Sequence, residues 1–100
     1  MNDLRSEYER KVQMLADMAR EMRRRGVEAE TIARAVHAER LAIAKAFKNI
    51  TPEPLRTRIQ ARTIAQYGDV AGPSIDWLRT AEKSWDEIID SASRPGSLPD

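Results

Sequence analysis

The sequence predicts an all-α protein in which two long antiparallel helices are followed by three shorter helices in a compact bundle. Apolar residues recur at three- and four-residue steps along most of the chain, which is the period of a helix with one buried side. Strand-like alternation of apolar and polar residues never extends beyond a few positions. With 100 residues, of which 41% are apolar, the chain is long enough for one domain with a modest core.

The first helix is expected over residues 3–25. Charged residues fill the face opposite its apolar stripe, and arginines at its end suit the negative end of the helix dipole. Gly26 is a natural stop for this helix. The apolar stripe consists of Leu4, Tyr8, Val12, Leu15, Met18, Ala19 and Met22.

The second helix is expected over residues 28–48. The turn at Gly26 is so short that the two long helices must form an antiparallel hairpin. Small side chains on this helix would allow close approach of a neighbouring helix. Its buried stripe consists of Ile32, Val36, Ile43 and Phe47, and its alanines are Ala33, Ala35, Ala42, Ala44 and Ala46.

The third helix is expected from Pro52 to Tyr67. Thr51 fits its N-cap position, and proline is favoured at the first helical position because it lacks the amide hydrogen that would stay unpaired there. Gly68 is well placed to end this helix in a left-handed conformation.

Two further short helices are expected before the chain ends. Pro73 can open the fourth, which carries Trp77 and Leu78. Ser84 and Glu87, three residues apart, form the pattern of a capping box at the start of the fifth helix.

These elements are expected to form a single helical domain over residues 1–93. It would consist of a helical hairpin, residues 1–48, and a short-helix subdomain, residues 51–93, followed by an irregular tail at 94–100. The tail contains two prolines and a glycine, which predict an irregular structure.

Composition excludes several classes of site. The chain has no cysteine and one histidine, so a disulfide, a thiolate zinc site and a multi-histidine metal site cannot form, and no cofactor or metal is expected. No apolar run reaches membrane-spanning length, and no signal peptide is recognisable. The net charge of +1 argues against a strongly basic nucleic-acid coat, although local basic clusters could contact a few phosphates.

The first candidate cluster is centred on His37. It shares a helix face with Arg34 and Arg40 at three-residue spacing. An imidazole can act as general acid or base while guanidiniums hold a phosphate, which suits RNA cleavage without a metal ion. The alternative is a half-buried histidine on a helix flank.

The second candidate cluster lies in the second half of the chain. Arg58 and Arg62 are four residues apart on the third helix, Tyr67 follows about one turn later, and Asp69 and Arg94 complete the group. The alternative is a solvated helix face with a buried tyrosine, in which the glycines and proline of "YGDVAGPSIDWL" only stop one helix and start the next.

From the second helix onward, the segments "VHAER", "TPEPLRTRI", "YGD..GPSIDWL" and "KSWDEIIDSASRPG" resemble the C-terminal toxin domains of bacterial polymorphic toxins of the contact-dependent inhibition type. The resemblance covers about residues 27–96. It departs from the family pattern at Thr63, where asparagine is expected, and at Glu82, where glycine is expected. Toxin domains of this size are often nucleases that act on tRNA or rRNA, each paired with an immunity protein. The resemblance raises six residues above their neighbours as site candidates: His37, Arg40, Arg62, Tyr67, Asp69 and Arg94.

Three functional hypotheses follow. The first is a toxin-like, metal-independent ribonuclease, delivered as part of a larger secreted toxin and acting on tRNA or rRNA in the cytoplasm. The second is a non-catalytic helical protein–protein interaction module whose first helix pairs with a partner helix or with its own copy as a homo-oligomer. The third, least favoured because the second half is net negative, is a DNA-binding domain that uses the short C-terminal helices.

Overall fold

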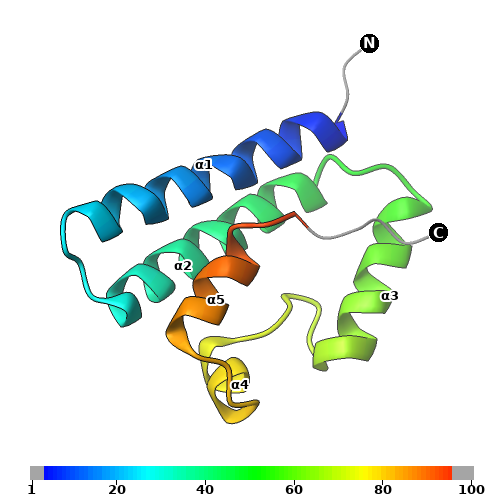
Figure 1. Cartoon of the computed structure of the whole chain (residues 1–100). Coiled ribbons are helices and arrows are strands. Elements are labelled where there is room, and N and C mark those ends of the chain that lie inside the picture. The colour runs from blue at the N-terminus through cyan, green and yellow to red at the C-terminus, as the bar shows by residue number, and fades with distance from the viewer. Residues whose placement is uncertain (1–3, 96–100) are drawn as a thin grey trace.

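The computed structural model describes residues 4–95 and confirms the all-α class (Figure 1). Within these residues no strand forms, and the two long helices precede three shorter ones, as predicted. The helices are α1 (Leu4–Arg24), α2 (Ala29–Lys48), α3 (Leu55–Tyr67), α4 (Ile75–Thr80) and α5 (Trp85–Ala92). Of the expected irregular tail, only residues 94 and 95 lie within the described part.

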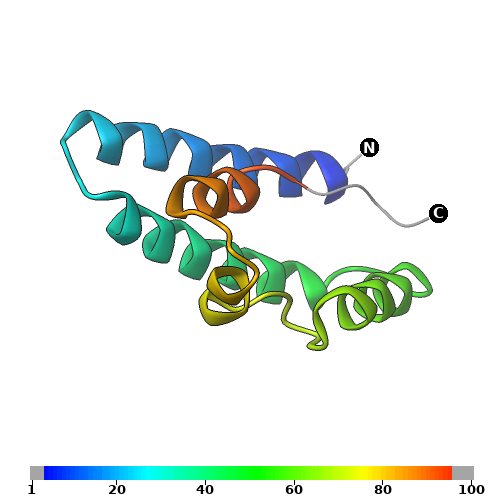
Figure 2. The same ribbon diagram turned by 60° about the horizontal axis from the view of Figure 1, so that its bottom comes forward.

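The helices α1 and α2 form the predicted antiparallel hairpin (Figures 1 and 2). Its turn is closed by two backbone hydrogen bonds, from the Gly26 amide to the Arg23 carbonyl at 3.0 Å and from the Val27 amide to the Met22 carbonyl at 3.0 Å. This pattern is a Schellman motif, which requires a left-handed residue after the helix. Gly26 supplies it with a φ of 81°, because it has no Cβ to clash.

The core lies between α1, α2 and α5, and α4 closes one side of it with Leu78. A fully buried isoleucine or valine contributes about 1.5–3 kcal/mol through removal of apolar surface from water. Because its residues Ile88, Ile89 and Ala92 are buried, the short helix α5 belongs to the main core together with the hairpin. The buried core residues are Val12, Leu15, Ala19, Ile32, Ala33, Val36, Leu78, Ile88, Ile89 and Ala92.

The starts of α4 and α5 are fixed by serine caps. The Ser84 hydroxyl accepts from the Glu87 amide at 3.1 Å, and the Glu87 carboxylate accepts from the Ser84 amide at 2.9 Å, which confirms the predicted capping box. At α4 the cap is Ser74, whose hydroxyl accepts from the Trp77 amide at 3.0 Å. The prediction that Pro73 opens this helix was wrong, since Pro73 precedes the cap.

The predicted start of α3 was wrong by three residues. The helix begins at Leu55, with Pro54 as its N-cap residue. Thr51 closes the preceding helix, because its hydroxyl donates to the Phe47 carbonyl at 2.6 Å. The first-turn amide of Thr57 is satisfied by the Glu53 carboxylate at 2.9 Å. The Glu53 carboxylate therefore has the capping role that the sequence predicted for the Thr51 hydroxyl.

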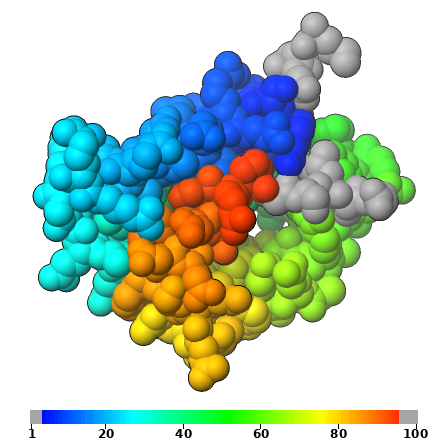
Figure 3. Space-filling model, in the orientation of Figure 1, coloured from blue at the N-terminus to red at the C-terminus, as the bar shows by residue number. Residues whose placement is uncertain are grey.

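The helix α3 stands apart from the core. None of its residues is buried, and Ile64 is 49% exposed. It ends at Gly68, which has a φ of 78° and donates to the Ile64 carbonyl, as predicted. Figure 3 shows a hollow between α5 (orange) and α3 (yellow-green). The chain therefore leaves the core at the end of α2 and returns to it at α4. We call the segment between these two helices, residues 49–74, the excursion.

Candidate functional site

His37 lies on α2, half-buried, and is fastened to the loop between α3 and α4. Its Nε2 is 2.8 Å from the Pro73 carbonyl oxygen. A carbonyl can only accept, so Nε2 carries the proton and donates. In the neutral ring the lone pair is then on Nδ1, and only Nδ1 can accept a proton from a substrate. The loop carbonyl therefore fixes both the tautomer and the orientation of the imidazole.

Arg40, nearly one turn further along α2, joins three parts of the chain. Its Nε donates to the Tyr8 hydroxyl at 3.1 Å, and its Nη1 donates to the carbonyls of Ala92 and Arg94, both at 2.8 Å. The guanidinium also lies 5.5 Å from the centroid of the Tyr8 ring, whose edge packs against Phe47. These bonds use three of its five N–H groups, and the two on Nη2 have no partner among residues 4–95, which leaves them as donors for a ligand.

Arg94 meets Arg40 through its backbone and not through its side chain. The Arg94 Nε donates to the Asp90 carbonyl at 3.3 Å, and the residue lines a cavity between α1 and α5. The end of α5 and the α3–α4 loop are thus both attached to α2, the first through Arg40 and the second through His37.

Tyr67 and Asp69 shape the loop after α3. The Tyr67 ring packs edge-on against Trp77, with ring centroids 5.1 Å apart. The Asp69 carboxylate accepts from the Ala71 amide at 2.8 Å, a local turn that aspartate commonly forms. Both contacts have a structural role. Trp77 is still 41% exposed and offers an accessible aromatic face beside Tyr67.

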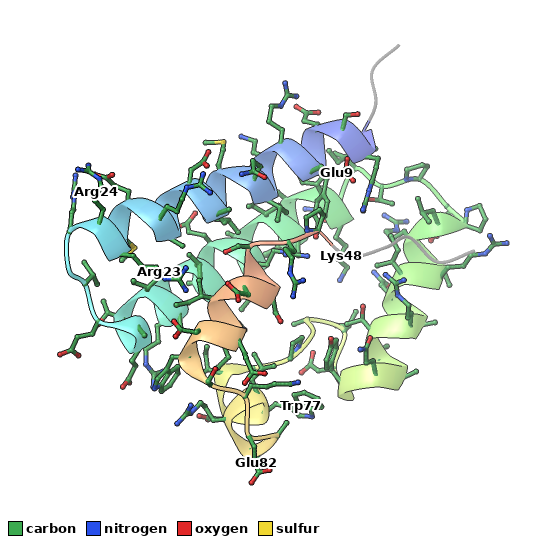
Figure 4. The ribbon with its side chains drawn as sticks, viewed as in Figure 1. Glu9, Arg23, Arg24, Lys48, Trp77 and Glu82 are labelled. Carbon is green, nitrogen blue, oxygen red and sulfur yellow. The ribbon has the colours of Figure 1, made fainter. Side chains whose placement is uncertain are left out.

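Arg62 lies exposed on α3 with Arg58 one turn before it. Within residues 4–95, neither guanidinium lies within 4 Å of a carboxylate, and the same holds for Lys48 at the end of α2. Figure 4 places Lys48 near the C-terminal end of α2 and Trp77 beside α4 on the side of α3. Unpaired cations and an exposed aromatic ring thus occur around the excursion.

The arginine cluster at the end of α1, by contrast, is paired with carboxylates. Arg20 is bonded to Asp17, Arg23 to Asp86 at 3.2 Å, and the following two arginines to Glu21. The hydrogen bond from Arg24 is the main cause that holds the pKa of the Glu21 carboxyl below its usual value. This cluster is mainly a set of surface ion pairs.

Two contributors to the site were not singled out from the sequence. Tyr8 was assigned only to the apolar stripe of the first helix, although its hydroxyl accepts from Arg40. The Pro73 carbonyl orients His37, and a backbone carbonyl leaves no signal in a sequence. Trp77 also had a signal in the sequence, because aromatic side chains near basic residues are the surfaces on which bases stack in proteins that bind single-stranded nucleic acid.

Among residues 4–95, no group of three or more metal-ligating side chains is placed to hold a metal ion. No helix in the same part of the chain combines the length and apolarity needed to cross a membrane. No protein-family model, no curated protein sequence and no solved structure matches this chain.

Proposed function

We propose that this chain is a toxin-type ribonuclease domain that cleaves RNA without a metal ion. The observation that carries the proposal is the oriented imidazole of His37, whose Nε2 is bonded to the Pro73 carbonyl while Nδ1 is left as the base. A base oriented by a third group is the arrangement that activates hydroxyl nucleophiles. The free N–H groups of Arg40, nearly one turn away on the same helix, supply donors for a phosphate.

In the proposed reaction, Nδ1 of His37 takes the proton from a ribose 2′-hydroxyl, and the oxygen forms a bond to the adjacent phosphorus. The bond between phosphorus and the 5′ oxygen breaks, and that oxygen takes a proton from water. The hydroxide that remains takes the proton from His37, which restores the base. The products are a 2′,3′-cyclic phosphate and a 5′-hydroxyl end. Arg40 Nη2 stabilises the charge that develops on the phosphate oxygens.

The RNA on either side of the cleaved bond would contact the excursion. Arg62 and Lys48 supply unpaired positive charge for phosphates, and the ring of Trp77, supported by Tyr67, offers a stacking surface for a base. Asp69 and Arg94 hold the two backbone segments that meet α2. Phosphate contacts of this kind weaken with salt, so binding is expected to fall as ionic strength rises.

The test uses purified protein with total tRNA and with ribosomes, in the presence of a chelator. His37→Gln is the decisive variant because a glutamine amide can still donate to the Pro73 carbonyl but provides no base. We expect cleavage to fall by about 10²–10⁴-fold, the usual contribution of a general base, with unchanged thermal unfolding. His37→Ala should lose both activity and the loop contact.

Cleavage ends identify the mechanism. Fragments with 2′,3′-cyclic phosphate support it, whereas chelator-sensitive cleavage or 3′-hydroxyl ends contradict it. Failure of the wild-type protein to cut either substrate, together with no growth defect on expression in the cytoplasm, would also refute the proposal. In the toxin setting, the domain would be delivered as part of a larger protein and blocked by a cognate immunity protein.

A second candidate function, a helical interaction module, is favoured by a groove of about 340 Å³ on the hairpin. Most of the side chains that line the groove are apolar, among them Met14, which is 58% exposed, and the lining includes one positive and one negative side chain. We propose a second copy of this chain as its occupant, because a two-fold axis would set Lys11 of one copy against Glu39 of the other. The groove is lined by Lys11, Met14, Leu15, Met18, Glu39 and Ile43.

Light scattering over a concentration series tests this pairing. Lys11→Glu and Glu39→Lys should each reduce the dimer fraction, and the double swap should restore it. Lys45→Glu, an exposed change outside the groove, is the control. A monomer at every concentration would exclude the dimer.

A further inference from the structure

The cavity between α1 and α5 is separate from His37 and has its own chemistry. Its volume is about 460 Å³, which falls in the range of small-molecule sites. Arginines from α1 and from the segment just after α5 line it, together with an amide, a hydroxyl and one carboxylate. The polar residues that line it are Gln13, Arg20, Arg23, Asp90, Ser93 and Arg94.

Ser93 is the residue that points to a ligand. Its Oγ is buried and has no hydrogen-bond partner within the described residues. A buried hydroxyl without a partner costs about 1–3 kcal/mol. Ser93 lines the cavity, so a rotation about its Cα–Cβ bond would bring the hydroxyl within reach of a ligand oxygen or nitrogen there.

The three arginines keep donors for such a ligand. Arg20 and Arg23 donate to Asp17 and Asp86, and Arg94 donates through Nε to a backbone carbonyl. Each guanidinium has five N–H groups, so each retains several. Figure 4 shows Arg23 on the side of α1 that faces α5, consistent with its 3.2 Å bond to Asp86.

The end of a helix carries negative partial charge, which would ordinarily oppose an anion near Ser93. Here the guanidinium of Arg40 donates to the carbonyls of Ala92 and Arg94. It offsets the charge of that helix end and fixes the backbone that carries Ser93 and Arg94. Arg40 is therefore a positioning residue for this cavity.

We propose that this cavity binds a ribose phosphate. The guanidiniums of Arg20, Arg23 and Arg94 would hold the phosphate oxygens, the Ser93 hydroxyl would complete the set, and the Asp90 carboxylate would accept from a ribose hydroxyl. A ribose phosphate comes either as a free nucleotide or as part of an RNA strand. The inference rests on the lining of the cavity and not on cleavage by His37.

The experiment measures binding of inorganic phosphate, adenosine monophosphate and a short uridine oligonucleotide by calorimetry at low and moderate salt. The protein carries His37→Gln, so that no probe is consumed. Arg20→Gln and Ser93→Ala should each weaken binding by about tenfold, as expected for loss of one charged or buried hydrogen bond. Arg24→Gln, an exposed change on the same helix outside the cavity, should leave it unchanged.

Ser93→Ala separates a ligand role from a structural one. Removing an unpartnered buried hydroxyl should leave the free protein as stable as before or more stable, while it weakens binding. A loss of stability together with unchanged binding would overturn the proposal. Arg23→Gln is a further variant, and if it unfolds, the other two still decide.

Binding of adenosine monophosphate that depends on the cavity residues assigns the site to a free nucleotide. Tighter, cavity-dependent binding of the oligonucleotide assigns it to an RNA strand. If no probe binds, or if Arg24→Gln weakens binding as much as Arg20→Gln, the cavity has no such role. These outcomes concern binding alone, so an absence of RNA cleavage by the wild-type protein leaves them intact.

Discussion

The contacts of Arg40 give the sharpest stability prediction. Replacing Arg40 with alanine removes the hydrogen bonds to the Tyr8 hydroxyl and to the carbonyls of Ala92 and Arg94. The first two are partly buried, and hydrogen bonds to a charged group contribute about 1.5–3 kcal/mol each. The third is exposed and contributes little. We therefore expect the free energy of unfolding to fall by about 2–4 kcal/mol, after some rehydration of the freed carbonyls.

That loss is large for a domain of this size, whose total stability is on the order of 5–15 kcal/mol. Since about 1 kcal/mol shifts the melting temperature of such a domain by roughly 4–8 °C, the midpoint should fall by about 8–30 °C. Arg40→Lys should recover only part of the loss, because an ammonium cannot present the planar fork that reaches both carbonyls and the hydroxyl.

Urea unfolding followed by far-ultraviolet circular dichroism and by tryptophan fluorescence measures the effect. Arg24→Ala is the matched control, because its guanidinium is 74% exposed and pairs with a neighbour on the same helix. It should cost about 0.5 kcal/mol or less. If Arg40→Ala is no more destabilising than this control, then the hydrogen bonds of Arg40 do not hold α2 to α1 and to the end of α5, and the reasoning is refuted.

Two other predictions concern the core and acid stability. Ile88→Ala, in the fully buried core, should lower the free energy of unfolding by about 2–5 kcal/mol. Ile64→Ala on α3, where the side chain is 49% exposed, should lower it by less than about 0.5 kcal/mol. Equal losses in urea unfolding would contradict the separation of α3 from the core. The pKa of Glu87 is held below its usual value, chiefly because its carboxylate accepts from the Ser84 backbone amide. Its folded pKa is thus depressed, so its stabilisation is present above the pKa of an unfolded glutamate, about 4.3, and is lost as the pH falls through the folded pKa. Glu87→Gln should show less loss of urea resistance than the wild type in that acid window, and an identical acid profile would contradict the capping role.

The sequence predicted the elements well because most are marked by local chemistry. The capping box at Ser84, the left-handed Gly68 and the tight turn at Gly26 depend only on residues a few positions apart. The predicted start of α3 was wrong because both Thr51 and Glu53 are suited to cap a helix. The Glu53 carboxylate accepts from the Thr57 amide of α3, whereas the Thr51 hydroxyl donates to the Phe47 carbonyl of α2.

The candidate site was predictable only as a set of residue types. The sequence identified His37 and Arg40 as neighbours on one helix, and that spacing is correct. It could not show that the Pro73 carbonyl orients the ring, or that Arg40 spends most of its donors on Tyr8 and on the end of α5. Those contacts join residues more than thirty positions apart. The hairpin brings Tyr8 to Arg40, whereas the packing of the α3–α4 loop and of α5 on α2 supplies the other two contacts.

The detachment of α3 from the buried core has a consequence for how this molecule can change over generations. Residues 55–66 can be altered with little penalty to folding because none of them is buried, whereas Tyr67 packs against Trp77 and is less free to change. The segment is nevertheless anchored at its return by His37. A lineage under pressure to meet new targets could therefore diversify this arm while the three-helix body stays the same.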